Sequence, residues 1–185
     1  MNIGWIIAIV IVVLIVGLVV WGIKLYNQMI GSQEMVTNAM AQIAAQVESR
    51  WDALTNLIQA TTKYQSHESE TLTTIVKHRS GVDKNSSVKD VEKDDQAFAK
   101  AMRAIDVVVE QYPDLKAANV YQSTMNSVND YENNVRQARM IFNDTVTKYN
   151  RLIKTFPNSI VAGITGFKAS DYFEASVEKQ EMPQW

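Results

Sequence analysis

The sequence predicts an all-α protein, with a single N-terminal transmembrane helix followed by an elongated antiparallel bundle of three long helices. Residues 3–23 carry no formal charge and consist mostly of Ile, Val and Leu. Beyond them, apolar residues recur at the helical spacings of three and four. Only 7 Gly and 3 Pro are available to turn the chain, which favours long helices. We expect a transmembrane anchor at 1–24, a helical bundle at 25–155 and, at 156–185, a tail that folds back and has a flexible end.

The apolar stretch 3–23 has the length that a membrane span requires. A helix of 21 residues rises ~31 Å, about the thickness of the hydrocarbon core. A cleaved signal peptide would need a shorter apolar region, a basic start and a small-residue cleavage site, and none of these features is present. We therefore expect single-pass attachment to the cell membrane. The side chains expected to anchor the span at the membrane surface are Trp5, Trp21, Lys24 and Tyr26.

The flanking charges decide which side of the membrane the bundle occupies. The terminal amine on one side is balanced by Lys24 on the other. Met1 and Asn2 include no Lys or Arg, so their translocation costs little. This favours an outward N-terminus and a cytoplasmic helical domain.

The first bundle helix is expected from Lys24 to Arg79, ~84 Å long. Its apolar residues follow a seam of coiled-coil type and include Val36, Met40, Ile43, Val47, Leu54, Leu57 and Tyr64. Ser80 and Gly81 end the pattern. A turn near Trp51 and Asp52 would instead give four helices, although no Gly or Pro supports that turn.

The second helix is expected to start at Ser87, with Asp90 beside its positive end, and to stop at Pro113. Pro113 then leads into a third helix, capped by Asp114, which ends before Pro157. The second helix, ~37 Å long, covers only about half of the first if the chain runs up, down and up. The stripe left without a partner predicts a contact between copies of the chain through Val36, Met40, Ile43 and Val47.

Five charged side chains fall on or beside the apolar stripes, where an ionised group needs a partner or a water: Arg50, Glu68, Asp95, Glu132 and Arg139. They are explained either as ion pairs that set helix register or as an internal polar site. Two arginines mixed with three acids favour pairing over catalysis.

The sequence indicates no catalytic residue, no metal ligand and no cofactor. His67 and Glu68 resemble the start of the helical zinc signature, but Thr71 stands where the second His belongs, and His78 is eleven residues from His67. There are 0 Cys, and no glycine-rich phosphate loop is present. The net charge of -2, with basic and acidic residues interspersed, argues against nucleic acid as a partner.

The order of short motifs along nearly the whole chain resembles the LemA family. The first half of the series is Tyr26-Asn27, Asn38-Ala39, Gln42-Ile43, Gln46-Val47, Arg50, Asp52, Leu54, Asn56-Leu57, Tyr64, His67-Glu68, Leu72 and Arg79. The second is Tyr112-Pro113, Leu115-Lys116-Ala117, Glu132-Asn133, Ala138-Arg139, Phe142-Asn143, Tyr149-Asn150, Phe156-Pro157, Gly166-Phe167 and Tyr172-Phe173. The chain departs from the family at Met40, where Trp is frequent, at Ser49, where a second basic residue is frequent, and at Thr55, where Pro is frequent.

The resemblance implies a membrane-anchored helical bundle, with some relatives linked to membrane compartment formation in magnetosomes. The family's recurrent polar positions correspond to Arg50, His67, Glu68, Glu132 and Arg139. It implies no active site.

These observations favour a noncatalytic membrane-anchored scaffold that homo-oligomerises and organises or shapes the membrane. Its expected partners are membrane lipid, further copies of the chain and other membrane proteins. The alternative is a signalling or adaptor protein that binds a small ligand, a peptide or a membrane-protein partner. A third alternative is a metal-assisted hydrolase around His67 and Glu68.

Overall fold

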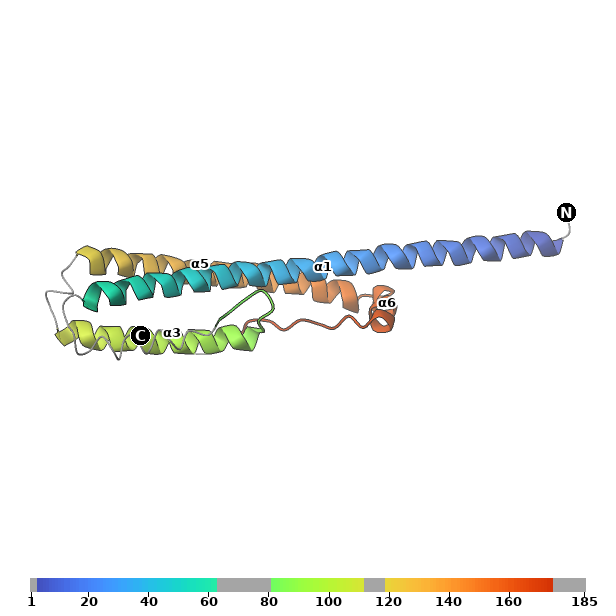
Figure 1. The fold of residues 1–185 in the computed structure, drawn as a ribbon. Coiled ribbons are helices and arrows are strands. Elements are labelled where there is room, and N and C mark those ends of the chain that lie inside the picture. Colours follow the sequence, from blue (N-terminus) through green and yellow to red (C-terminus); the bar gives the residue numbers. More distant parts are fainter. Residues whose placement is uncertain (1–2, 63–80, 112–118, 175–185) are drawn as a thin grey trace, which may run out of the picture. The chain divides into compact units, whose positions relative to one another are not determined.

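The computed structural model describes residues 3–62, 81–111 and 119–174. Every regular element in these ranges is a helix (Figure 1), which confirms the predicted all-α class and its long apolar N-terminal helix. The elements are α1 (Ile3–Thr62), α3 (Val88–Gln111), α5 (Asn119–Lys154) and α6 (Asn158–Thr165). Outside the described residues lie the end expected for the first helix, Glu68 and both histidines, the Pro113-Asp114 boundary and the end of the tail.

Helix α1 passes through residues 51 and 52 without a break. The alternative in which a turn near Trp51 creates an additional long helix is therefore wrong. No Gly or Pro occurs between residues 32 and 62, and the Thr55 hydroxyl donates to the Trp51 carbonyl oxygen at 2.7 Å, four residues back along the helix.

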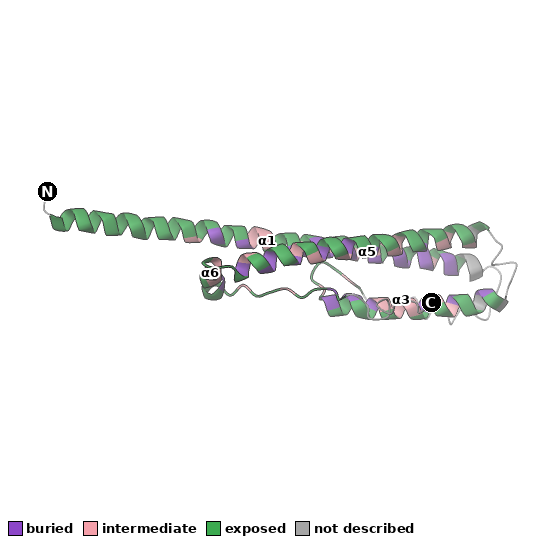
Figure 2. Cartoon of the chain, turned by 180° about the vertical axis from the view of Figure 1, so that it is seen from behind, coloured by how far each residue is buried: buried purple, intermediate pink, exposed green. Residues whose placement is uncertain are grey.

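The N-terminal part of α1 differs from the rest in its exposure. Every side chain from Ile3 to Trp21 is exposed, and the first buried side chain is Leu25 (Figure 2). One helix in the described part of the chain is long and apolar enough to cross a membrane, and it is this one. The chain thus carries an N-terminal apolar helix suited to membrane association.

The chain divides into two compact units, residues 1–36 with 144–171 and residues 37–143 with 172–185. In the first unit, Leu25 and Met29 of α1 and Val146, Tyr149 and Ile153 of α5 are buried. In the second, most of the buried side chains come from α1, α3 and α5 and include Ile43, Trp51, Leu54, Leu57, Val91, Phe98, Ile105, Val128, Val135 and Phe142.

Within the second unit, α5 runs antiparallel to both other helices. Asp95 of α3 pairs with Arg139 of α5. Farther along α3, Asp106 lies near Tyr121, which is closer to the start of α5; burial and then the negative charge of Asp106 raise the pKa of Tyr121. Helices α1 and α3 run in the same direction (Figure 1). The expected alternation of direction therefore holds between α3 and α5 but not between α1 and α3; residues 63–80, which lie between these two helices in the sequence, are outside the described residues.

The stripe expected to contact a second copy is instead buried within the single chain. Val36 is 9% exposed, Met40 4%, Ile43 0% and Val47 2%. The prediction failed because it compared the length of the first helix with that of the second helix alone. The third helix, α5, is 36 residues long and lies along this part of α1. These four side chains are therefore core residues, and the proposed oligomer contact through them is wrong.

Candidate functional site

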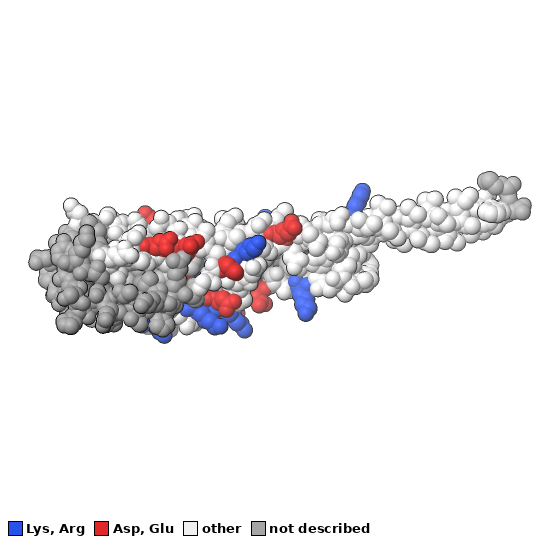
Figure 3. All heavy atoms as spheres, viewed as in Figure 1, with Lys and Arg blue, Asp and Glu red and all other residues white. Residues whose placement is uncertain are grey.

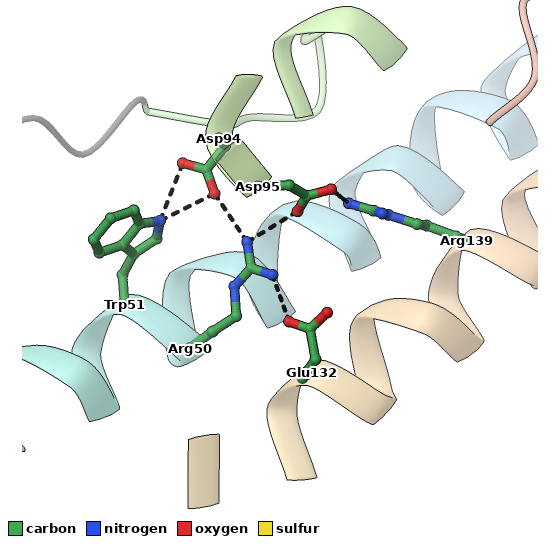
Figure 4. Close-up of polar contacts among 6 residues, drawn as sticks. All are labelled: Arg50, Trp51, Asp94, Asp95, Glu132 and Arg139. Carbon is green, nitrogen blue, oxygen red and sulfur yellow. Dashed lines mark hydrogen bonds and ion pairs between the residues drawn. The ribbon is translucent and has the colours of Figure 1, made fainter. Parts of the chain in front are cut away.

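Charged side chains from three helices converge in the core of the second unit (Figure 4). Around them the helices are held together by apolar contacts; the charged groups at the centre are almost fully buried, and those at the edge are partly exposed. The members of this charge cluster are Arg50 and Trp51 of α1, Asp94 and Asp95 of α3, and Glu132 and Arg139 of α5.

Arg50 is the centre of the charge cluster, and its side chain is 1% exposed. One terminal nitrogen donates to Glu132 Oε2 at 2.7 Å. The other donates to Asp94 Oδ2 and to Asp95 Oδ1, each at 3.1 Å. The guanidinium carbon also lies 4.1 Å from the centroid of the Phe98 ring, a cation–π contact. A single α1 side chain therefore binds both α3 and α5.

Asp94 is a fully buried carboxylate, with 0% of its side chain exposed. Besides the Arg50 bond, it accepts from the Trp51 indole N–H, which lies 3.0 Å from each carboxylate oxygen. The Trp51 ring is itself buried and packs edge-on against Phe98, with the ring centroids 5.2 Å apart. A buried carboxylate is tolerated because donors satisfy it on two sides.

Asp95 joins the two arginines of the charge cluster, since its second oxygen accepts from Arg139. The Arg139 guanidinium carbon lies 5.0 Å from the centroid of the Phe173 ring. Phe173 is buried and is bound by Asn143, whose side-chain amide accepts from its N–H at 3.0 Å and donates to its carbonyl oxygen at 2.9 Å. The cluster thus connects the helices to the C-terminal segment that follows α6.

The charge cluster holds three carboxylates against two guanidinium groups, and each carboxylate accepts a hydrogen bond from an arginine. The Nε atoms of Arg50 and Arg139 are buried and have no acceptor among the described residues. Chemically, the arrangement fixes the three helices in one register. A ligand would have to displace the buried Arg50–Asp94 ion pair to reach the centre of the cluster.

A second feature of this unit is a groove of about 380 Å³ between α1 and α5. Four side-chain amides and the half-exposed Ile141 give it a mixed polar and apolar lining. The lining residues are Gln42, Ala45, Gln46, Asn134, Gln137, Ala138 and Ile141.

Four of the five charged residues singled out from the sequence meet in the charge cluster: Arg50, Asp95, Glu132 and Arg139. Glu68 lies outside the described residues. Sequence reasoning missed Asp94 and Trp51. A signal for Asp94 existed, because it lies three residues after the buried Val91 and four before Phe98, on the apolar stripe of α3.

The residues expected at the membrane surface are all exposed. Trp5 is 69% exposed, and Trp21 and Tyr26 are each 41% exposed. Lys24 is exposed as well. The Tyr26 ring also packs edge-on against Phe167, with the ring centroids 5.8 Å apart.

Within the described ranges, no group of three or more His, Cys, Asp or Glu side chains is arranged to hold a metal ion. His67 and Glu68, on which the hydrolase alternative depends, lie outside those ranges.

Comparison with known proteins finds relatives that cover either part or most of the chain. Magnetosome protein MamQ of Magnetospirillum gryphiswaldense is 37% identical over 79 residues, which are 43% of this chain and 29% of that protein. Magnetosome protein MamQ 2 of Paramagnetospirillum magneticum is 34% identical over 80 residues, with the same shares of 43% and 29%. Protein LemA of Metamycoplasma hominis is 28% identical over 167 residues, 84% of this chain and 74% of that protein. The chain therefore spans less than a third of the length of the magnetosome proteins.

The LemA family matches residues 39–185. This range contains every member of the charge cluster and the groove, together with α3, α5 and α6. The resemblance seen in the ordered motifs is confirmed by this match and by the LemA relative that aligns over most of the chain. With most of its bundle and its whole charge cluster inside the matched range, this chain belongs to the LemA family.

Proposed function

We propose that this LemA-family chain is a noncatalytic, membrane-anchored helical scaffold. In this proposal, α1 crosses the cell membrane once, the helical units lie on the cytoplasmic side, and copies of the chain and other membrane proteins assemble on them. The observation that carries the proposal is the continuity of α1, whose exposed apolar span passes directly into a helix that is packed from Leu25 onward.

Two further observations support membrane organisation as the role. Lipid is the natural surrounding for the span, because its side chains from Ile3 to Trp21 are exposed in the folded chain. The relatives named as magnetosome proteins, although they align over only 43% of this chain, agree with the link to membrane compartments that the family resemblance implies.

The charge cluster favours a structural role over binding or catalysis. Arg50 and Asp94 are almost completely buried and bonded to each other, and Asp95 and Glu132 are each held by an arginine. Breaking a buried pair costs several kcal/mol, about 3–5 in comparable cases, which is a large barrier to ligand binding at this place.

Self-assembly must use a surface other than the buried stripe of α1. Ile141 and Met140 of α5 are 52% and 65% exposed, and Ile141 lines the amide-rich groove. We place the contact between copies here, because anchoring in one membrane raises the local concentration of chains and a modest interface then suffices.

The mass of the full-length protein in detergent, measured by light scattering, tests self-assembly. The unaltered chain is expected to exceed the mass of one copy, and Ile141→Arg is expected to reduce it to one copy. Val107→Arg on α3 is the matched control, because Val107 is 58% exposed and lies outside the groove. A single-copy mass for the unaltered protein would refute self-assembly.

A separate experiment tests on which side of the membrane the helical units lie. Because the sequence contains 0 Cys, one introduced cysteine is the only thiol that can be labelled. Asp130→Cys, at an exposed position of α5, is expected to react with a membrane-impermeant maleimide only after the cells are permeabilised. Labelling of intact cells would place the helical units outside.

The groove also favours a second function, an adaptor that binds a peptide or a membrane-protein partner. Side-chain amides such as those of Gln42, Gln46 and Gln137 can pair with a peptide backbone. This function predicts that a partner peptide raises the melting temperature of the protein and that Gln46→Leu removes the rise. A rise that persists in this variant would locate the binding elsewhere.

A further inference from the structure

Helix α6 exposes an apolar face that nothing in the first unit covers. On α6, Ile160 and Ile164 are four residues apart and are 54% and 81% exposed, and Phe156, two residues before the helix, is 77% exposed. The opposite face packs inward, with Ala162 only 4% exposed. Between Lys154 and Lys168 the sequence has no charged residue. One face of α6 is therefore buried, and the opposite face is apolar although it is exposed.

The residues that directly follow α6 contact α1 just after the apolar span. Phe167 packs edge-on against Tyr26, which follows the span 3–23 by three residues. Gly166, with φ 80°, adopts a left-handed conformation that suits glycine and ends α6, and its N–H donates to the Ala162 carbonyl oxygen at 2.9 Å. Figures 1 and 2 both show α6 beside α1 beyond the end of α5.

Bonds to α5 fix the residues that follow α6. The Tyr149 hydroxyl donates to the Lys168 carbonyl oxygen at 2.9 Å. Asn150 and the Ser170 backbone form a reciprocal pair, with the Asn150 side chain donating to the Ser170 carbonyl oxygen and accepting from its N–H, both at 2.9 Å. Together with the Tyr26–Phe167 contact, these bonds hold α6 near the part of α1 that follows the span.

We propose that Phe156, Ile160 and Ile164 insert into the interfacial layer of the same bilayer that α1 crosses, giving the chain a second membrane contact. This inference rests on the proposed membrane anchoring. The Tyr26–Phe167 contact places the end of α6 next to the end of the span, and Figure 3 shows no charged side chain over α6 or the span on the visible side. Exposed basic residues flank the segment at Arg151 and Lys154, where they can reach lipid headgroups while the apolar side chains enter the acyl boundary.

Lipid fits this face better than a second copy of the chain does. A stable protein interface buries about 800 Å² on each partner, from some twenty or more residues, whereas this face offers three large side chains. An interfacial helix needs no such area, since its apolar residues have only to reach the acyl boundary of a membrane to which the chain is already attached.

The test uses full-length protein in vesicles of phosphatidylcholine and phosphatidylglycerol, with an environment-sensitive fluorophore on single cysteines. Ile164→Cys reports on α6, Leu14→Cys on the span, and Val107→Cys on α3 serves as the exposed control. Lipids carrying a nitroxide near the headgroup are expected to quench the Ile164 probe at least about threefold more than the Val107 probe.

The outcomes separate this inference from the anchoring on which it rests. Quenching at Leu14 by deeply placed nitroxides, with Ile164 no more quenched than Val107, overturns the α6 contact alone. Absence of quenching at Leu14 overturns the anchor itself. An Ile164 probe that is shielded but not quenched, and that responds to the protein-to-lipid ratio, would show that a second copy covers the face and would also overturn the proposal.

A second variant confirms that the apolar side chains are responsible. With the fluorophore at Thr165→Cys, replacing Ile160 and Ile164 by Ser is expected to lower headgroup quenching to the level of the Val107 probe. Unchanged quenching would contradict insertion through this face.

Discussion

At the scale of single residues, Arg50 shows how a buried charge can be compatible with a helical core. Its guanidinium reaches carboxylates on two other helices and lies over the ring of Phe98, so each ionised group finds a partner. Pairing of this kind offsets the loss of hydration without adding much net stability, but removing one partner leaves the others uncompensated. The cluster therefore specifies how the helices meet more than it strengthens their packing.

Replacing Arg50 by Met should destabilise the protein strongly. Asp94 would then stay buried without its arginine partner, and we expect a loss of about 3–5 kcal/mol in the free energy of unfolding. Thermal or denaturant unfolding of the detergent-solubilised protein measures it. Arg136→Met, at an exposed position of α5, is the control and should change stability little. Equal effects of the two variants would contradict the structural role of Arg50.

Tyr149 supports a second residue-scale prediction, because its buried hydroxyl donates to the Lys168 carbonyl oxygen at 2.9 Å. Tyr149→Phe should cost about 1 kcal/mol of unfolding free energy through the lost hydrogen bond. Tyr131→Phe, at a half-buried tyrosine of the same helix, is the control. Denaturant titration of both variants checks the difference.

The pH dependence of the Tyr149 effect follows from the same burial, which raises the pKa of its hydroxyl above the ordinary 10.0. The folded state holds this proton more tightly than the unfolded state does, so the stabilisation is complete below pH 10.0 and is lost as the pH rises through the folded pKa. The difference in stability between the unaltered protein and Tyr149→Phe should therefore shrink in alkaline solution. A difference that grows there would contradict this sign.

At the scale of elements, the start of α3 is determined locally. The Ser87 hydroxyl donates to Asp90 Oδ2 at 2.7 Å and accepts from the Asp90 N–H at 3.3 Å, while the Ser87 N–H donates to the same carboxylate oxygen at 2.9 Å. This reciprocal arrangement satisfies N–H groups that a helix leaves without partners at its start. Helix α3 accordingly begins at Val88, one residue after the start predicted at Ser87.

Ser87→Ala tests this cap. The substitution should lower the free energy of unfolding by about 1 kcal/mol, as loss of a serine cap does in other helices. Ser127→Ala, at an exposed position inside α5, is the matched control and should be neutral or slightly stabilising, because Ala is the better helix former there. Circular dichroism during thermal unfolding provides the measurement.

The cap also predicts an acid dependence. Hydrogen bonds from the Ser87 hydroxyl and then the Ser87 N–H lower the pKa of Asp90 below its ordinary 3.8. The contribution is present above pH 3.8 and disappears as the pH falls through the lower folded pKa. The difference between the unaltered protein and Ser87→Ala should shrink in this acidic range, and no change there would contradict the linkage.

At the scale of the whole molecule, one helix serves two environments. The side chains of α1 from Ile3 to Trp21 are exposed, whereas later positions such as Met29, Ile43 and Leu54 are completely buried. The first set suits lipid and the second suits a protein core, although both are apolar. What separates them is whether α3 and α5 provide side chains to pack against.

The anchor predicts that a charge in the span will displace the chain from the membrane. Leu14 is 62% exposed near the middle of the span, and an Arg there costs about 2.5–3.5 kcal/mol of insertion free energy. We expect Leu14→Arg to increase the fraction of chain released by alkaline carbonate, whereas Leu14→Ala remains in the membrane pellet. Release of the unaltered chain would refute the anchor.

The sequence by itself determined the helical class, the apolar span, the start of α3 and most of the charged residues that meet in the core. These features follow from local chemistry, since hydrophobic length, helical period and a capping pair act over a few turns. Four of the five inward charges could be recognised because they interrupt an apolar stripe, and Asp94 carried the same signal on α3.

Tertiary structure alone decided which helix covers which stripe. Val36, Met40 and Ile43 have the same apolar character whether they face a second copy or α5, and only the path of α5 along α1 made them core. The same holds for the shared direction of α1 and α3 and for the outward apolar face of α6, because periodicity identifies a stripe but carries no information about its partner.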